Sequence, residues 1–165
     1  MAEFRNYLFG AFCLEHGIEH QFFAPCIPQQ NGVVERKNRT LVKMARMMLD
    51  EHRTPRKFWA KAISTACYIS NQVFLRSILN LTSYDLRFGR QSKISHLRVF
   101  GCWCFILNRG NLDKFESFSS YGIFLGYSLH DHPYRVFNLD TNTIMEPYDV
   151  TFDESTPCAS ASFSV

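Results

Sequence analysis

The sequence predicts a mainly helical first part, residues 1–90, followed by a small all-β barrel or meander, residues 91–154. Apolar residues recur at helical spacing in the first part, and they alternate or form short continuous runs in the second. The charge also divides, because residues 1–98 carry 15 Lys and Arg against 7 Asp and Glu, whereas residues 99–165 carry 3 against 8. A chain of 165 residues is long enough for one ordinary domain or two small ones.

Capping residues mark the expected helices of the first part. Gly17 can end the first helix in a left-handed conformation. Thr54-Pro55 offers a capping hydroxyl followed by proline at the first helical position, and Thr82 to Asp85 has the pattern of a capping box. Gly89 closes that last, short helix. The expected helices are residues 6–16, 33–51, 54–73 and 82–89.

Short apolar segments separated by turn residues mark the expected strands. One strand, residues 18–24, is expected in the first part, where it leads into a loop that contains two prolines and Asn31-Gly32. The Ser- and Ala-rich end of the chain, residues 155–165, is expected to be a frayed tail. The strands expected in the second part are residues 97–107, 121–127, 134–139, 143–145 and 148–152.

The basic charge is concentrated in one segment. Residues 35–61 hold nine Lys and Arg against three Asp and Glu, a local net charge of +6. Such an excess favours a polyanionic partner such as nucleic acid, although a solvated helix face has the same composition. The residues expected to contact DNA, without sequence preference, are Arg36, Lys37, Arg39, Lys43 and Arg46.

The most specific pattern lies between Pro25 and Leu41, where a Pro-x-x-Pro-Gln-Gln-Asn-Gly loop precedes Glu35 on a basic helix. This segment resembles the loop and catalytic helix of copia-type retrotransposon integrases, which belong to the DDE recombinase group. The resemblance covers nearly the whole chain. Its other matches are Glu3-Phe4, Phe12-Cys13, Gly17-Ile18, His20, Phe58-Trp59, Ala62, Tyr68-Ile69, Asn71, His96 to Cys102, Phe124 to Ser128, Tyr134 to Val136 and Asp149 to Glu154.

The resemblance implies an α/β fold of the RNase H-like superfamily, of which residues 1–90 are the mainly helical C-terminal half of the integrase core. Residues 91–154 are then the small Src-homology-3-like barrel of the same Pol polyprotein. In the family, two aspartates and one glutamate hold two Mg2+ ions for strand transfer. Glu35 matches that catalytic glutamate. The residues that match the active-site loop are Pro28, Gln29, Gln30, Asn31 and Gly32.

The sequence departs from the family at its start. Met1-Ala2 stands where an Asp-x-Gly arrangement supplies the second catalytic aspartate, and the first aspartate is absent as well. We therefore expect a truncated remnant that has no autonomous catalysis and binds no Mg2+, because Glu35 alone is an incomplete ligand set.

Residual sequence-independent DNA binding is the leading functional hypothesis. The alternative is a protein-interaction scaffold or inert fragment that associates with an intact integrase or with itself, because a lost sheet would leave the apolar faces of the long helices uncovered. A live nuclease would require aspartates supplied in trans. No stretch approaches the roughly 18 apolar residues of a membrane span, and no signal peptide is present, so we expect an intracellular chain in the nucleus or cytoplasm.

Overall fold

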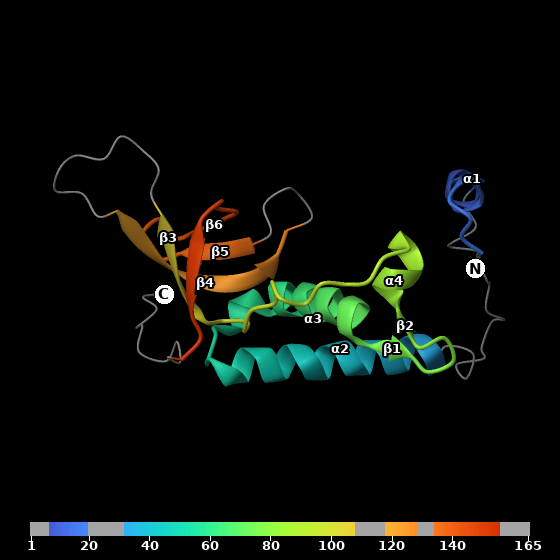
Figure 1. Cartoon of the computed structure of the whole chain (residues 1–165), viewed down its shortest axis with the longest axis horizontal. Helices are drawn as coiled ribbons and strands as arrows, with labels where there is room; N and C mark the ends of the chain where they lie inside the picture. The colour runs from blue at the N-terminus through green and yellow to red at the C-terminus, as the bar shows by residue number, and fades with distance from the viewer. Residues whose placement is uncertain (1–6, 20–31, 108–117, 129–133, 156–165) are drawn as a thin grey trace. The chain divides into compact units, whose positions relative to one another are not determined.

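The computed structural model describes residues 7–19, 32–107, 118–128 and 134–155 (Figure 1). The chain forms two compact units, residues 1–38 and residues 39–165. Helix α2 (Gly32–Glu51) crosses this division, with its first seven residues in unit 1 and the other thirteen in unit 2. Most of the expected strand 18–24, the loop before Gly32 and nearly all of the expected tail lie outside the described residues.

Unit 1 contains helix α1 (Tyr7–Glu15) and the start of α2. Gly17 has a φ of +64° and ends α1 as predicted, because its N–H bonds to the carbonyl of Leu14 and the next N–H bonds to the carbonyl of Cys13. A glycine in the left-handed conformation therefore ends this helix. Residues 32–38 of α2 are exposed.

Unit 2 contains the remaining helices: the rest of α2, a 3-10 turn η2 (Arg56–Phe58), α3 (Trp59–Val73) and α4 (Ser83–Phe88). The predicted capping box is present in α4, since Thr82 and Asp85 each bond to the other's backbone N–H. The predicted cap at Thr54 is wrong. Neither η2 nor α3 has a side-chain cap, and the Thr54 hydroxyl is buried against Gly101 instead.

Five strands form one antiparallel sheet in the order β6-β5-β4-β3-β7. Their order shows that β3 to β6 follow one another as a meander, and β7 returns to pair with β3. A short hairpin of β1 (Leu75–Arg76) and β2 (Leu81–Thr82), which was not predicted, separates α3 from α4. The strands of the sheet are β3 (Trp103–Leu107), β4 (Ser119–Tyr127), β5 (Tyr134–Asn138), β6 (Thr143–Met145) and β7 (Val150–Asp153).

The first strand of the sheet begins later than expected. Residues 97–102 were predicted as strand because they are apolar, but they form turns, in which the Leu97 N–H bonds to the Ile94 carbonyl and the Cys102 N–H bonds to the Val99 carbonyl. Phe100 and Cys102 are nevertheless buried. Strand-like pairing is limited to the end of the run, where the Gly101 N–H donates to the Phe124 carbonyl and the Phe124 N–H donates to the Cys102 carbonyl. Burial accounts for the apolar character of Phe100 and Cys102.

The main core of unit 2 joins its helices to its sheet. Figure 1 shows α3 running along one face of the sheet, and the core contains residues from α2, α3, β4 and β5. The structure differs in part from the expectation of uncovered helices, because α3 packs against β4 of the sheet and Ala45 and Leu49 of α2 are buried in the same core. The buried members of this core are Ala45, Leu49, Phe58, Ala62, Phe100, Ile123, Leu125 and Phe137.

Two glycines allow very close contacts where the helical part of unit 2 meets its sheet. Gly126 of β4 lies against Thr65 of α3, and Gly101, just before β3, lies against Thr54 in the turn after α2. A Cβ at Gly101 would collide with the Thr54 hydroxyl, and a Cβ at Gly126 would collide with the Thr65 hydroxyl. Both glycines have positive φ, +81° and +119°. We call these four residues the helix–sheet seam. The core includes residues from both predicted ranges, 1–90 and 91–154, and the two compact units divide after residue 38. Neither observation tests the predicted domain boundary at residue 90, which stays a prediction.

Among the described helices, none is long and apolar enough to cross a membrane. Four described cysteines, Cys13, Cys67, Cys102 and Cys104, are free thiols. Burial raises the pKa of the Cys102 thiol to about 12, so this thiol stays protonated at neutral pH. It is therefore a packing residue of the core.

Candidate nucleic-acid interface

Glu35 lies in the first turn of α2, in unit 1, where the sequence placed it. Its side chain is exposed to solvent. Gly32 is the first residue of the same helix, whereas Pro28, Gln29, Gln30 and Asn31 lie outside the described residues. The structure thus positions the candidate glutamate and the end of the candidate loop, and the role of both stays a prediction.

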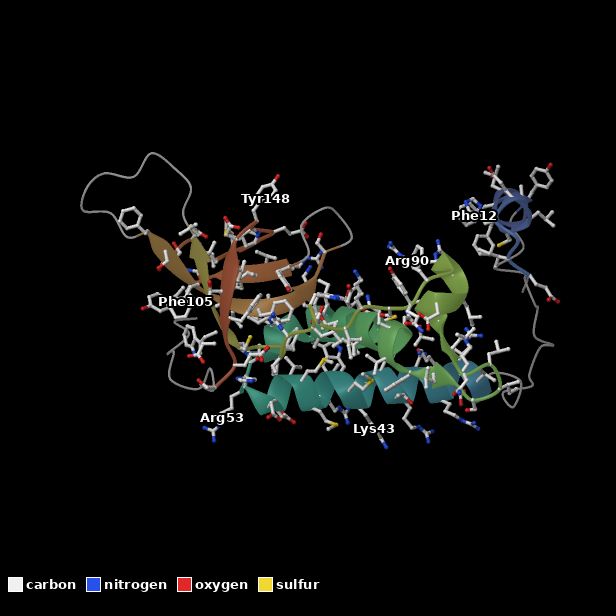
Figure 2. All side chains as sticks on the ribbon, viewed as in Figure 1. Phe12, Lys43, Arg53, Arg90, Phe105 and Tyr148 are labelled. Atoms are coloured by element: carbon white, nitrogen blue, oxygen red, sulfur yellow. The ribbon has the colours of Figure 1, made fainter. Side chains whose placement is uncertain are left out.

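Three predicted cations lie on the part of α2 that belongs to unit 2. Arg39, Lys43 and Arg46 are exposed, and at 100° per residue they fall within roughly 60° of one another around the helix. The buried residues Ala45 and Leu49 lie on another side of the helix, roughly 100° to 160° and 60° to 120° away from these cations. Figure 2 shows Lys43 pointing away from α3. We call these three residues the basic face of α2; one acidic residue, Asp50, follows on the same side.

The two other predicted cations, Arg36 and Lys37, belong to unit 1 and are also exposed. They are adjacent in the sequence and so project about 100° apart on the helix. The structure therefore brings three of the five predicted contact residues onto one face of unit 2 and places the other two on the preceding unit.

A second group of cations was missed by the sequence analysis. Arg76, Arg87, Arg90 and Lys93 line one cleft of unit 2, beside the rings of Tyr84 and Phe88. The available signal was the segment Arg87-Phe88-Gly89-Arg90, in which basic and aromatic residues alternate at a helix end. The sequence analysis assigns this segment only to the end of a short helix.

The described residues do not fit a two-metal site on their own. No group of three or more His, Cys, Asp or Glu side chains lies together in the part of the chain that the structure describes. A pair of Mg2+ ions needs several carboxylate oxygens, and Glu35 offers one exposed carboxylate. No step of the function proposed below therefore runs through a metal ion.

Comparison with known proteins shows which families this chain resembles. Residues 102–163, which include the described strands β3 to β7, match the family model of the retroviral polymerase SH3-like domain. The chain is 34% identical over 93% of its length to the retrovirus-related Pol polyprotein from transposon TNT 1-94 of Nicotiana tabacum. It is 32% identical over 92% and 86% of its length to the Pol polyproteins from transposons RE2 and RE1 of Arabidopsis thaliana. The chain corresponds to a segment of a retrotransposon Pol polyprotein.

This segment spans only 10–12% of the length of those Pol polyproteins. The copia-type resemblance is confirmed, and the predicted SH3-like domain agrees with the family match. A chain of the cryo-EM structure of a simian T-cell lymphotropic virus intasome, in complex with the PP2A regulatory subunit B56 gamma, matches 89% of this chain and 55% of its own. Its TM-score of 0.38 and its 14% identity establish nothing about the core, so the RNase H-like assignment stays a prediction.

Proposed function

We propose that this Pol polyprotein segment is an integrase fragment that binds DNA without sequence preference, and that the basic face of α2 is its main contact. The observation that carries the proposal is the exposure of Arg39, Lys43 and Arg46 on one side of a helix whose other side is anchored in the core. A helix fixed in this way presents its cations at a constant spacing. Phosphate groups along a duplex offer matching negative charge.

The proposal also concerns catalysis, which we do not expect from this segment alone. Glu35 corresponds to the catalytic glutamate of the resembling integrases, yet the described residues supply no cluster of carboxylates around it. We therefore propose that Glu35 contributes to catalysis only when other carboxylates are supplied by another chain or by a longer form of this one. DNA binding, by contrast, needs only the cations that this chain carries.

A salt titration tests the contact. Fluorescence polarisation of a labelled duplex would compare the parent with the variant Arg39→Ala/Lys43→Ala/Arg46→Ala. Each phosphate contact contributes about 0.9 to the slope of log affinity against log salt concentration, so the triple variant is expected to lower that slope by about 2 to 3. Affinity at low salt should fall at least tenfold.

The matched control is Arg56→Ala, which removes one exposed charge outside the basic face and should change the slope little. Circular dichroism would verify that each variant keeps its helices. Binding that is insensitive to salt, or an equal loss of affinity in the control and the triple variant, would contradict the proposal.

A second observation favours the scaffold hypothesis as another candidate function. The hairpin between α3 and α4 exposes apolar side chains, of which Ile78 is 96% exposed. Single exposed apolar residues are ordinary, but a continuous group is typical of an interaction surface. Light scattering from the parent chain distinguishes a monomer from an associating scaffold. The exposed residues of the group are Val73, Phe74, Leu75, Ile78, Leu79 and Leu81.

A further inference from the structure

Unit 2 contains an open cleft of about 700 Å3 beside α3, bounded by α4 and by the segment of residues 90–96. This volume lies within the range of pockets that bind small ligands, roughly 300 to 1,000 Å3. Neither the sequence motifs nor the proposed contact on α2 accounts for it. We call it the basic cleft.

All the formally charged side chains that line the basic cleft are positive. Its lining includes three arginines and one lysine but no Asp or Glu. All four cations are exposed, and none of them forms an ion pair with a described carboxylate. Cations gathered in a concave site raise the local concentration of anions. The cleft therefore favours an anionic ligand. The four cations are Arg76, Arg87, Arg90 and Lys93.

Two rings in the cleft add a flat apolar surface. Tyr84 and Phe88 lie one turn apart on α4, with ring centroids 4.7 Å apart, and Phe88 is 54% exposed. The guanidinium carbon of Arg90 lies 5.9 Å from the Tyr84 centroid, and that of Arg87 lies 5.7 Å from the Phe88 centroid. An exposed ring beside guanidinium groups is the arrangement on which nucleic-acid bases stack.

Hydrogen bonds hold the walls of the cleft together. The carboxylate of Asp85 accepts bonds from the Thr82 N–H at 3.0 Å and the Ser92 N–H at 2.9 Å, so it joins α4 to the segment 90–96. Those bonds also hold the pKa of Asp85 below its usual value. On the α3 side, the Ser92 hydroxyl donates to the Gln72 side chain at 3.3 Å. The cleft is thus formed before any ligand arrives, which lowers the entropic cost of binding.

We propose that the basic cleft binds one unpaired nucleotide of a single-stranded nucleic acid, with its base stacked on Phe88 and its phosphates held by the four cations. A base inside a duplex has both faces covered by its neighbours, so Phe88 can stack only on a base that has left the stack. The exposed side chain of Asn71, which also lines the cleft, supplies polar groups for the edge of the base. This proposal rests on the proposed function, because it names a second, strand-selective contact for the same class of ligand.

The experiment compares two probes on the full chain: a labelled oligo-dT single strand and a labelled duplex of equal length. The variants are Phe88→Ala, which removes the ring, and Arg87→Ala/Arg90→Ala, which removes two cations. Loss of one base stack is expected to weaken single-strand affinity about 5- to 100-fold. The arginine variant should lower the single-strand salt slope by about 1.4, since each phosphate contributes about 0.7. Duplex affinity should change less than threefold.

Matched controls keep these effects specific. Phe118→Ala removes a ring that is 70% exposed outside the cleft, and Arg56→Ala removes an exposed cation outside the cleft. Both should leave single-strand affinity unchanged. Phe88→Tyr keeps an aromatic face and should bind like the parent, which separates stacking from a general disturbance of α4.

The outcomes separate this proposal from the function on which it rests. If the cleft variants bind oligo-dT like the parent while the α2 triple variant binds weakly, the cleft is overturned and the α2 contact stands. If only the cleft variants lose affinity, the α2 contact is overturned and the cleft stands. Competition by a poly-glutamate peptide as effective as by oligo-dT at equal ionic strength would also overturn the cleft proposal, because charge alone would then account for binding.

Discussion

The helix–sheet seam and the basic cleft both lie beside the helices of unit 2, but they differ in packing, in open volume and in charge. In the seam, Gly101 and Gly126 let the backbone approach Thr54 and Thr65 so closely that a Cβ has no space. In the cleft, long cationic side chains and two rings surround about 700 Å3 of open volume. We therefore expect changes in the seam to alter stability, because its close packing leaves no space for an added side chain. We expect changes of the exposed cations in the cleft to alter ligand binding more than stability.

Two stacked tyrosines, Tyr68 and Tyr127, connect the basic cleft to the core beside the seam. Tyr68 lines the cleft, and its ring stacks on the buried Tyr127 at a centroid distance of 4.3 Å and an interplanar angle of 19°. The Tyr68 hydroxyl is 2.9 Å from Nε2 of His96, another residue of the cleft. This stacked pair is therefore a direct contact between a buried ring of the core and the lining of the cleft.

Gly126→Ala is expected to have the largest effect on the seam. The new methyl group would collide with the Thr65 hydroxyl, and alanine would be held at a φ of +119°. Backbone strain and overpacking each cost about 1 to 3 kcal/mol, so the free energy of unfolding should fall by about 3 kcal/mol or more. Urea unfolding followed by tryptophan fluorescence measures this loss.

Gly10→Ala is the control for that change, because nothing lies within 4 Å of Gly10 and it lies inside α1. Alanine there should be neutral or stabilise by up to about 1 kcal/mol. Adding Thr65→Ala to Gly126→Ala should restore part of the lost stability by removing the collision. A Gly126→Ala protein as stable as the parent would show that the seam is not close-packed.

Tyr127→Phe tests the stacked pair of Tyr68 and Tyr127, which joins the two regions, through the pH dependence of the free energy of unfolding. Burial raises the pKa of Tyr127 to about 12, from about 10 in an unfolded chain. Between about pH 10 and pH 12 the folded state therefore retains a proton that the unfolded state has lost. The contribution of Tyr127 to the free energy of unfolding is complete below about pH 10 and is lost as the pH rises toward 12. The parent should lose at most about 1.4 kcal/mol per pH unit from this group.

Urea unfolding between pH 8 and about 11 measures that slope. Cys102, whose pKa burial also raises to about 12, acts in the same direction, so Tyr127→Phe should reduce the alkaline slope without abolishing it. At neutral pH the variant should lose about 1 kcal/mol, because the Tyr127 hydroxyl accepts a bond from the Arg98 N–H at 2.8 Å. Tyr121→Phe, at a ring that is 55% exposed, is the control and should keep the parent slope.

Local signals in the sequence predicted local structure, and they failed where packing decides. Gly17 and the capping box at Thr82 act within one turn of chain, so both helix ends could be predicted. Thr54 has the same chemistry as a cap, but its hydroxyl is buried against Gly101, some 47 residues later in the sequence, and has no hydrogen-bond partner among the described residues. An apolar run such as residues 97–102 likewise indicates burial and cannot distinguish a strand from a packed turn.

The same distinction applies to the candidate sites. The helix that carries Arg39, Lys43 and Arg46 was predicted, and the exposure of these three residues on one face follows from the helical period. The basic cleft could not be predicted in this way. Its cations come from β1, α4 and the following segment, and its rings face them only after the hairpin and α4 fold against α3.

Arg53→Gly is expected to have the smallest effect, at the turn that leads from α2 into the seam. Arg53 has a φ of +49°, and its N–H and that of Thr54 bond to the carbonyls of Asp50 and Leu49, a helix end that favours glycine. Relief of about 1 to 2 kcal/mol of left-handed strain is partly offset by the entropy of glycine in the unfolded chain, so stability should rise by about 0.5 kcal/mol. Thermal unfolding by circular dichroism measures this gain.

Two further variants separate conformation from charge at this turn. Arg53→Asn removes the charge but tolerates the left-handed conformation, and Arg53→Ala removes the charge and keeps the strain. If strain is the cause, Asn should stabilise nearly as well as Gly, while Ala should not. Equal stabilisation by all three would instead show that the positive charge of Arg53 is the destabilising feature, and that this turn tolerates side chains that Gly101, which lies against Thr54, has no space for.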